Sequence, residues 1–184
     1  LSPKFLCLLN FVKKLPVHIT DLLRPEVQNY LIEHEWADET KLVLKQKTHL
    51  GIATSLLAEQ LKGRRKAKEK LPSFYKTKNI IYPPQLNLEQ SSSEVTATFK
   101  SKLVAGKQLV DLTGGFGIDA YFFSKKFKQV NYVEPDAELS EIVQHNLETL
   151  GATNISFHNQ SAEEYLKTLT QADVIYIDPS RRSG

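Results

Sequence analysis

The sequence predicts an α/β fold in two parts: a small all-helical N-terminal domain over residues 1–78 and a mostly parallel sheet over residues 79–184. Two observations predict it. Before residue 75, apolar residues recur at the three- and four-residue spacing of amphipathic helices. From Gln108 onward, short apolar runs alternate with helix-like stretches, so that four strands are separated by three helices. This alternation is typical of parallel sheets with right-handed helical crossovers.

The composition is that of an ordinary globular protein. Hydrophobic residues make up 41% and charged residues 24% of the 184 residues, and the formal net charge is +3. The single cysteine, Cys7, excludes an internal disulfide, which favours a reducing, cytoplasmic compartment. No apolar run is long enough to span a membrane, and His49 and His158 lack metal-ligand spacing. Because the chain begins with Leu and contains no Met, we expect it to be a fragment.

The helices of the first part are assigned from their start and stop signals. Pro25 suits the first turn of one helix, and Asp38 can cap a short second one. A longer apolar pattern begins at Ile52 and runs into the basic stretch Arg64 to Lys70, before Pro72 ends it. Two interpretations of the basic stretch remain open, namely contact with phosphates or a solvated helix face.

The segment that joins the two parts contains Tyr82-Pro83-Pro84, which cannot form regular helix. We therefore predict that residues 79–88 are a linker or the first strand of the second part. Ser91 and Glu94 have the spacing of a capping box at a helix start, although Ser91, Ser92 and Glu94 could also contact a ligand there. The helix so predicted shares one apolar face, formed by Val95, Phe99 and Leu103.

The strongest functional signal lies between Gln108 and Asp119. An apolar run ends in the glycine-rich stretch Asp111 to Gly117, and a helical pattern from Ala120 to Phe127 follows. A strand, a glycine turn and a helix bring backbone N–H groups and a helix start close to a ligand. Glycine is needed there because a Cβ would block the close approach and because such turns often have positive φ.

The acid at the end of this strand separates two ligand classes. Gly115, Gly117 and Ala120 match a dinucleotide-binding fingerprint. Asp111, however, would face a pyrophosphate unfavourably, and it would suit a ligand with a cationic end, such as the amino-acid part of S-adenosylmethionine. Glu134, which closes the next predicted strand, could bind ribose hydroxyls of either ligand.

The remaining strands are predicted at Gln129 to Val133, Ile155 to His158 and Asp173 to Ile177. Ligands of parallel sheets bind beyond the carboxyl ends of the strands. Four groups of residues are expected to meet at that edge: Asp111 to Gly117, Glu134, Gln160 to Ala162, and Asp178 to Arg181.

Each acidic residue also has a simpler explanation. Asp111 could only cap the turn, Glu134 could be a solvated acid, and Asp119 could only complement the helix dipole. Their combination at one edge of one sheet favours a binding site.

These residues resemble the motifs of class I S-adenosylmethionine-dependent methyltransferases: Asp111 to Gly117, then Glu134, then Asp178-Pro179-Ser180-Arg181. With Tyr82-Pro83-Pro84 and Gln90 to Glu94, they look like a bacterial family of predicted RNA methyltransferases. The resemblance implies a Rossmann-like sheet, here a truncated class I methyltransferase core, with a helical region before it. The THUMP-like C-terminal domain of that family would lie beyond residue 184.

The resemblance also implies contacts to the cofactor, S-adenosylmethionine. Asp111 and the glycines would cradle its methionine end, and Glu134 would hold the ribose. Relatives often have Asp where this chain has Ser161, so the adenine contact is open, although the N–H of Ala162 could serve the ring. The full predicted cofactor set is Gln90, Ser91, Asp111, Thr113, Gly115, Gly117, Asp119, Glu134, Pro135, Ser161 and Ala162.

The predicted catalytic residues follow the last strand: Asp178, Pro179, Ser180 and Arg181. Amino methyltransferases often have Asp or Asn, two prolines and an aromatic residue there, and they accept hydrogen bonds from an exocyclic amine. Asp178 and Pro179 match that pattern, whereas Ser180 and Arg181 depart from it; Arg181 could stack on a base or bind phosphate. The stretch also resembles uracil-C5 methyltransferases, so the favoured exocyclic amine and uracil C5 both remain open.

Two other functions remain open, an NAD(P)-dependent oxidoreductase and a non-catalytic RNA-binding module with a decayed cofactor site. The expected partner is an RNA substrate, with no metal and no membrane. Class I methyltransferase sheets have more than the four strands predicted here, so we expect this chain alone to be inactive. Its last strand would expose an edge at which another chain could pair.

Overall fold

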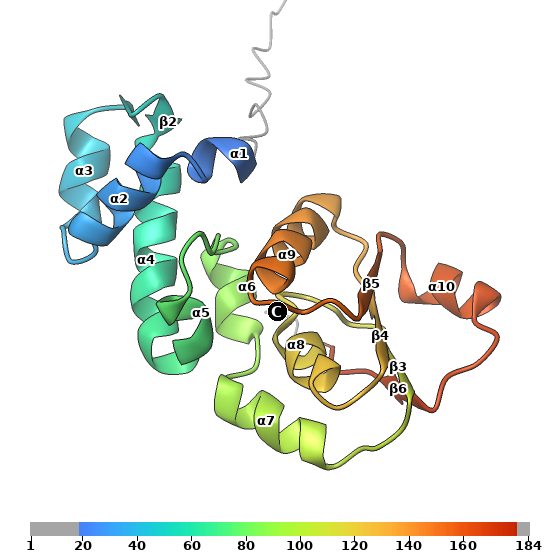
Figure 1. Cartoon of the computed structure of the whole chain (residues 1–184). Coiled ribbons are helices and arrows are strands. Elements are labelled where there is room, and N and C mark those ends of the chain that lie inside the picture. Colours follow the sequence, from blue (N-terminus) through green and yellow to red (C-terminus); the bar gives the residue numbers. More distant parts are fainter. Residues whose placement is uncertain (1–18, 180–184) are drawn as a thin grey trace, which may run out of the picture.

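The computed structural model describes residues 19–179, and the first part of this range is helical (Figure 1). The helices before residue 77 are α1 (Ile19–Leu22), α2 (Pro25–Glu33), α3 (Glu39–Lys45), α4 (Thr54–Lys70) and α5 (Pro72–Lys76). As predicted, α2 begins at Pro25, and the Asp38 carboxylate caps α3 by accepting hydrogen bonds from two backbone N–H groups. Residues 1–18 of the predicted helical domain lie outside the described range.

A short antiparallel hairpin in this part was not predicted. It consists of β1 (Thr48–His49) and β2 (Ile52–Ala53). The turn residues Leu50 and Gly51 have φ of 53° and 76°, so the chain reverses there. Ile52 was assigned to the long helix, which is wrong, because α4 begins only after this turn and strand, at Thr54.

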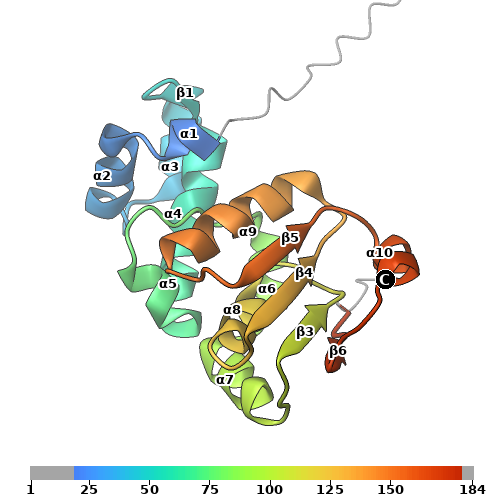
Figure 2. The same cartoon turned by 45° about the vertical axis from the view of Figure 1, so that its right-hand side comes forward.

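The second part is built on a four-stranded, fully parallel sheet (Figure 2). Its strands are β3 (Gln108–Asp111), β4 (Gln129–Val133), β5 (Ile155–His158) and β6 (Val174–Tyr176). Their order in the sheet is β5-β4-β3-β6, and each neighbouring pair is parallel. The predicted alternation and parallel sheet are confirmed. The order places β3 and its glycine turn at the centre.

Helices cover both faces of this sheet, because its strands are apolar on both sides. Leu109 of β3 belongs to the main apolar cluster, with residues of α8 (Ile118–Ser124) and α9 (Ala137–Thr149). The next residue, Val110, belongs to a smaller cluster on the other face, with Tyr165 of α10 (Ala162–Thr168). Apolar packing on both faces therefore holds the strands, and with them their carboxyl ends, in a fixed orientation.

The joining segment, predicted as a linker or strand over residues 79–88, contains no strand, and its last residues are helical. Residues 80–84 have no regular secondary structure, and α6 (Gln85–Gln90) follows directly. Two buried amide side chains hold the backbone instead. Gln60 of α4 bonds the N–H and C=O of Tyr82 at 2.9 and 2.8 Å, and Asn146 of α9 bonds those of Ile81 at 2.9 and 2.7 Å.

The start of α7 (Glu94–Lys102) differs from the prediction in its cap. Ser93, not Ser91, is the N-cap, and its hydroxyl accepts a hydrogen bond from the N–H of Thr96 at 3.1 Å. Ser91 instead follows the end of α6. The Glu94 carboxylate does not return to the cap; it accepts hydrogen bonds from the N–H and hydroxyl of Ser73 at 2.5 and 2.8 Å.

The apolar face predicted for α7 points to solvent. Val95 is 81% exposed, and Phe99 and Leu103 are also exposed, while α7 buries Ala97 and Ser101. α7 packs against α8, and small side chains permit that close packing. An apolar stripe at helical spacing was therefore not a core stripe here.

One apolar cluster runs through both parts of the molecule. It extends from Leu22 and Leu57 to Val130 and Leu147. At the junction, the ring of Phe74 lies 5.7 Å from that of Phe116 and 5.6 Å from that of Tyr121. The division into two domains at residue 78 stays a prediction. Within residues 19–179, no helix is both long and apolar enough to cross a membrane.

Candidate active site

Glycines give the turn between β3 and α8 its shape. Gly115 and Gly117 have φ of 50° and 73°, in the left-handed region that glycine adopts without steric cost. A Cβ on Gly114 would lie 2.4 Å from the ring of Tyr132, and one on Gly117 would lie 2.4 Å from Val143. The predicted positive φ of this turn is therefore confirmed, and the close approach of a ligand stays a prediction.

Asp111, at the end of β3, is buried beneath this turn and is only 1% exposed. Its Oδ1 accepts hydrogen bonds from the N–H of Thr113 at 3.0 Å and from the hydroxyl of Thr113 at 3.3 Å. Burial raises the pKa of the Asp111 carboxyl to about 7, although the hydrogen bonds from Thr113 oppose this shift. The capping role is observed, and a contact to a ligand stays a prediction.

Glu134 joins the end of β4 to the same turn. Its Oε2 accepts a hydrogen bond from the N–H of Gly115 at 2.9 Å, and its Oε1 accepts one from the N–H of Asp136 at 3.0 Å. The hydroxyl of Tyr132 donates to the carbonyl oxygen of Gly115 at 2.6 Å. Two hydrogen bonds therefore hold the Glu134 carboxylate in place, so it is not a freely solvated acid. Its remaining lone pairs can accept further hydrogen bonds.

A cavity of about 540 Å³ lies beyond the carboxyl ends of the strands, as predicted. It brings together twelve of the predicted residues: Gln90, Ser91, Thr113, Gly115, Gly117, Asp119, Glu134, Pro135, Ser161, Ala162, Asp178 and Pro179. Asp111 does not line it, and the predicted catalytic residues Ser180 and Arg181 lie outside the described residues. Ser92, named above as a possible ligand contact, also lines it, and further lining residues that sequence reasoning missed include Asn87, Asp136, Leu139 and Glu163.

Ser161 lines the cavity while it caps α10. Its hydroxyl accepts a hydrogen bond from the N–H of Glu164 at 3.2 Å, and the Glu164 carboxylate accepts one from the N–H of Ser161 at 3.1 Å. The predicted capping box is confirmed. The structure thus accounts for Ser161 without a ligand.

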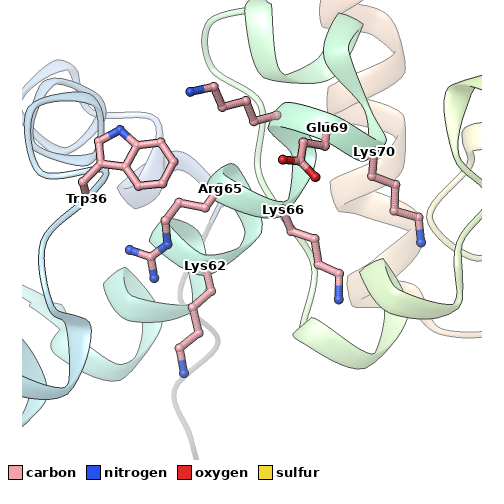
Figure 3. Close-up of a pocket in the computed structure, with 7 residues that line it drawn as sticks. Trp36, Lys62, Arg65, Lys66, Glu69 and Lys70 are labelled. Atoms are coloured by element: carbon pink, nitrogen blue, oxygen red, sulfur yellow. The ribbon is translucent and has the colours of Figure 1, made fainter.

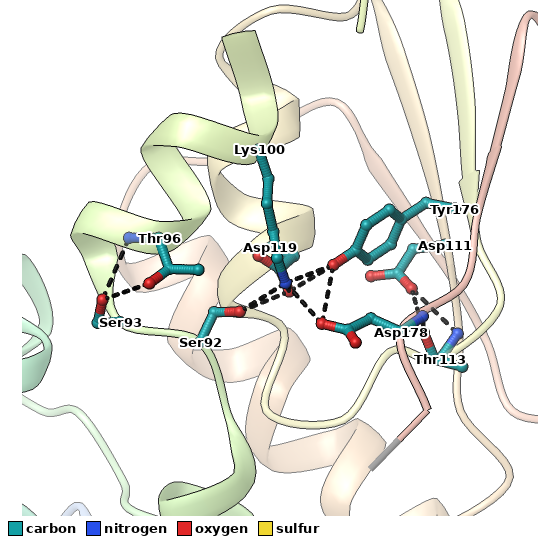
Figure 4. Close-up of polar contacts among 9 residues, drawn as sticks. All are labelled: Ser92, Ser93, Thr96, Lys100, Asp111, Thr113, Asp119, Tyr176 and Asp178. Carbon is teal, nitrogen blue, oxygen red and sulfur yellow. Dashed lines mark hydrogen bonds and ion pairs between the residues drawn. The ribbon is translucent and has the colours of Figure 1, made fainter. Parts of the chain in front are cut away.

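The wall near β6 holds a cluster of polar side chains around Lys100 of α7 (Figure 4). The Nζ of Lys100 lies 2.6 Å from Oδ2 of Asp178, 3.1 Å from Oδ2 of Asp119 and 2.6 Å from the hydroxyl oxygen of Tyr176. It also lies 2.9 Å from the hydroxyl oxygen of Ser92. One ammonium group therefore links α7, α8, the end of β6 and the segment before α7.

These contacts set the charges of the cluster. The hydrogen bond from Lys100 holds the pKa of the Asp178 carboxyl below its usual value, although burial opposes the shift. Burial also disfavours the charge on Lys100, yet its hydrogen bonds to Asp178 and Asp119 raise its pKa above the usual value. Asp178 is thus an ionised hydrogen-bond acceptor at neutral pH, and its N–H donates to the hydroxyl of Thr113 at 2.8 Å.

Asp119 contributes a carboxylate oxygen that can still accept hydrogen bonds. Its Oδ2 receives the hydrogen bonds of the cluster, whereas its Oδ1 is buried and has no hydrogen-bond partner within residues 19–179. A buried carboxylate oxygen without a partner is rare in proteins and suits a ligand that carries N–H groups. The glycine turn also leaves room, because a Cβ on Gly115 would meet no atom closer than 3.7 Å. These features fit the amino-acid end of S-adenosylmethionine.

Sequence reasoning missed Lys100 and Tyr176. They meet although they are 76 positions apart, and Lys100 and Asp178 are 78 apart. No local pattern marks such a contact, because it depends on how α7 packs beside β6. The segments meet because β6 lies beside β3 in the sheet, an order that the sequence analysis did not predict.

Comparisons with known proteins identify the fold. A model of the family described as "Conserved hypothetical protein 95" matches residues 93–182. A solved structure described as a "putative methyltransferase" from Porphyromonas gingivalis W83 is 27% identical over 89% of this chain, with a TM-score of 0.73. The chain has the class I methyltransferase fold. It spans about two fifths of the Porphyromonas protein, since it covers 41% of that chain.

A second solved structure is less similar to this methyltransferase fold. It is described as a "putative RNA methyltransferase" from Pyrococcus horikoshii and is 24% identical. The match covers 65% of this chain and 59% of that one, with a TM-score of 0.46. None of the curated proteins matches the sequence. The Porphyromonas structure confirms the predicted class I fold, and the THUMP-like domain stays a prediction.

Proposed function

We propose that the protein is a methyltransferase that uses S-adenosylmethionine and acts on a base in RNA. The class I fold and the cavity at the carboxyl ends of its strands support the cofactor. The resemblance of the sequence motifs to predicted RNA methyltransferases supports RNA as the substrate, and the match of Asp178-Pro179 to amino methyltransferases favours an exocyclic amine as the acceptor. Methylation at uracil C5 is the alternative target.

One observation carries the choice of cofactor, namely the charge of the cavity. Five acidic residues line it, and no Lys, Arg or His within residues 19–179 does so: Asp119, Glu134, Asp136, Glu163 and Asp178. Lys100 pairs with Asp119 and Asp178, so the excess negative charge comes mainly from Glu134, Asp136 and Glu163. This excess favours a ligand with positive groups and disfavours a diphosphate at close range. S-adenosylmethionine carries a sulfonium and an ammonium group, whereas NAD(P) carries a diphosphate. This balance supports a methyltransferase over an oxidoreductase.

The roles proposed for the residues follow from their positions. Glu134 accepts hydrogen bonds from ribose hydroxyls, and Asp119 accepts them from the amino group of the methionine end. Asp111 fixes the turn from below through Thr113. The N–H of Ala162 is the proposed partner of the adenine ring. When bound, S-adenosylmethionine supplies an electrophilic methyl group on its sulfonium.

Asp178 is proposed to orient the acceptor base. Its carboxylate is held ionised by Lys100, so it accepts a hydrogen bond from an exocyclic amine and turns the nitrogen toward the methyl group. An exocyclic amine of a base is conjugated and weakly nucleophilic, so correct orientation lowers the barrier most. Ser180 and Arg181 are proposed to complete this acceptor site.

Transfer of labelled methyl groups tests the proposal. The full-length protein is mixed with methyl-labelled S-adenosylmethionine and unmodified cellular RNA, and the label in RNA is counted. We expect transfer that Asp178→Ala abolishes and that the matched variant Asp173→Ala, at the opposite edge of the sheet, retains in its folded fraction. The proposal would be overturned if the folded protein reduced or oxidised a substrate with NAD(P) and did not transfer methyl groups.

A further inference from the structure

A second cavity lies along α4, away from the proposed active site (Figure 3). Its volume is about 720 Å³, and it is lined by Trp36, Lys62, Arg65, Lys66, Lys68, Glu69 and Lys70. We call these residues the basic groove. Five of its seven residues are cationic, one is acidic and one is aromatic. The proposed methyl transfer uses none of them.

Trp36 is the only tryptophan of the sequence, and it is 69% exposed. An indole ring is usually among the most buried side chains, because it carries a large apolar surface. Here the Nζ of Lys68 lies 4.9 Å from the ring centroid, in cation–π range. The ring therefore stands beside a positive charge with much of its surface open to a further stacking partner.

The loop that carries Trp36 is held rigidly on both sides of that residue. Arg65 Nη1 donates to the carbonyl oxygens of Glu35 and Ala37, at 2.9 and 3.2 Å. The buried carboxylate of Glu35 accepts from Arg64 Nε at 2.8 Å and from the hydroxyl of Tyr75 at 3.0 Å. The two arginines thus fix the backbone, and exposure of Trp36 does not result from a loosely held loop. Preorganised aromatic rings lose little entropy on binding.

Three lysines of the basic groove are open to an incoming anion. Lys62 has only a long ion pair, 3.8 Å to Glu39, and Lys66 has an exposed one, 2.7 Å to Glu89. Lys68 forms no ion pair within the described part of the chain. Exposed ion pairs contribute little free energy, so a phosphate can replace these carboxylates at low cost.

The basic groove leads to the wall of the proposed active site. Lys66 contacts the Glu89 side chain, and Lys70 Nζ donates to the carbonyl oxygens of Leu88 and Glu89, both at 2.8 Å. These residues belong to α6, whose last residue, Gln90, lines the active-site cavity. A strand that lies along α4 and crosses α6 would therefore arrive at that cavity.

We propose that the basic groove binds single-stranded RNA, with phosphates on Lys62, Lys66 and Lys68 and one base stacked on Trp36. A positive groove with an aromatic platform is how proteins hold single strands without sequence readout. The choice of RNA over other single strands rests on the proposed function. The groove would supply the affinity that the acidic active-site cavity lacks for a polyanion.

The fluorescence of Trp36 provides a direct test, because no other tryptophan contributes to the emission. The protein is titrated with an RNA oligonucleotide of about 12 nucleotides, within the range of single-strand site sizes. Stacking of a base on the indole is expected to quench the emission. Parallel titrations use DNA of the same sequence and poly-glutamate of similar charge. Affinities are then measured with end-labelled RNA by fluorescence anisotropy, so that variants without Trp36 can be compared.

The variants separate stacking from charge. Trp36→Leu is expected to weaken RNA binding by about 5- to 150-fold, the range for loss of one stacked base, whereas Trp36→Phe retains most of the affinity. Lys62→Ala combined with Lys68→Ala is expected to lower the salt slope of log K by about 1.4, or about 0.7 per phosphate contact. Lys126→Ala with Lys128→Ala is the matched control, since both lysines are exposed beyond α8 and outside the groove.

Several results would overturn the inference: no quenching by RNA, equal affinity of wild type and Trp36→Leu, or tighter binding of DNA or poly-glutamate than of RNA. Quenching with the expected variant effects supports it. Equilibrium dialysis with S-adenosylmethionine is run on the same samples. Loss of RNA binding with cofactor binding intact counts against the groove alone, whereas RNA binding without cofactor binding counts against the proposed methyltransferase.

Discussion

The buried carboxyl of Asp111 holds the glycine turn through Thr113, but its burial lowers the free energy of unfolding at neutral pH. Its burial raises the pKa to about 7 from a usual value near 3.8. Below about pH 4 the carboxyl is protonated in both the folded and the unfolded chain. Between about pH 4 and 7 only the unfolded chain has lost the proton, so stability falls as pH rises, and above 7 the loss is constant.

Asp111→Asn is therefore expected to change the pH dependence of stability. Asn keeps an acceptor for the N–H of Thr113 but does not titrate. The free energy of unfolding of the variant, relative to wild type, should rise by about 1.4 kcal/mol per pH unit between pH 4 and 7 and level off above 7. Urea unfolding across this range measures it. A difference between the two proteins that does not vary with pH would contradict the assignment.

Lys100 is the residue on which the polar cluster depends. Replacement by Met removes the charge that Asp119 and Asp178 share, and leaves two carboxylates close together. We expect Lys100→Met to lower the free energy of unfolding by about 1–3 kcal/mol at pH 7, less than for a fully buried pair because Asp178 is half exposed. Lys102→Met is the control, since Lys102 is exposed on the same helix. Equal effects of the two variants in urea unfolding would refute this role of Lys100.

At the level of elements, the sequence predicts starts and caps well where the signal is local. Asp38 and the Ser161–Glu164 box cap their helices as expected, because a cap involves residues two or three positions apart. The failures depend on distant partners. Glu94 was assigned to a local cap, but it bonds Ser73, and the apolar face predicted for α7 is exposed, because that helix packs through Ala97.

Residues 80–84 have no regular secondary structure, and side chains of α4 and α9 supply hydrogen bonds to their backbone. Asn146→Ala would leave the N–H and C=O of Ile81 buried without partners. We expect a loss of about 2–6 kcal/mol in the free energy of unfolding, since each of the two buried unpaired groups costs about 1–3 kcal/mol. Gln144→Ala, on the exposed face of the same helix, should cost much less. A loss below that of Gln144→Ala would contradict the account.

At the scale of the whole molecule, the strand and helix order was sufficient to predict the sheet and the edge at which the site forms. Parallel pairing follows from the βα alternation, and the cavity follows from the common direction of the strand ends. The side-chain network of the site was not predictable, because Lys100 reaches Asp178 only after α7 and β6 have packed. The continuous core through Phe74 and Phe116 depends on distant packing in the same way.

The position of β6 at one end of the sheet gives a prediction about association. Ile175 is 48% exposed, and the outer edge of β6 has no strand partner within residues 19–179. We expect this chain to self-associate at high concentration, as unprotected edges do, and Ile175→Lys to reduce association. Leu44→Lys, at an exposed position on α3, is the control. Light scattering after size exclusion measures the mass, and a monomer at every concentration would refute the prediction.

Binding of S-adenosylmethionine in competition with NADH, measured by isothermal titration calorimetry on the full-length protein, tests the central claim most directly. The account predicts that S-adenosylmethionine binds, that NADH does not displace it, and that Asp119→Asn, which retains the side-chain volume, weakens the binding. Binding of NADH in the absence of any binding of S-adenosylmethionine would contradict the claim that an acidic cavity over the glycine turn selects a cationic ligand.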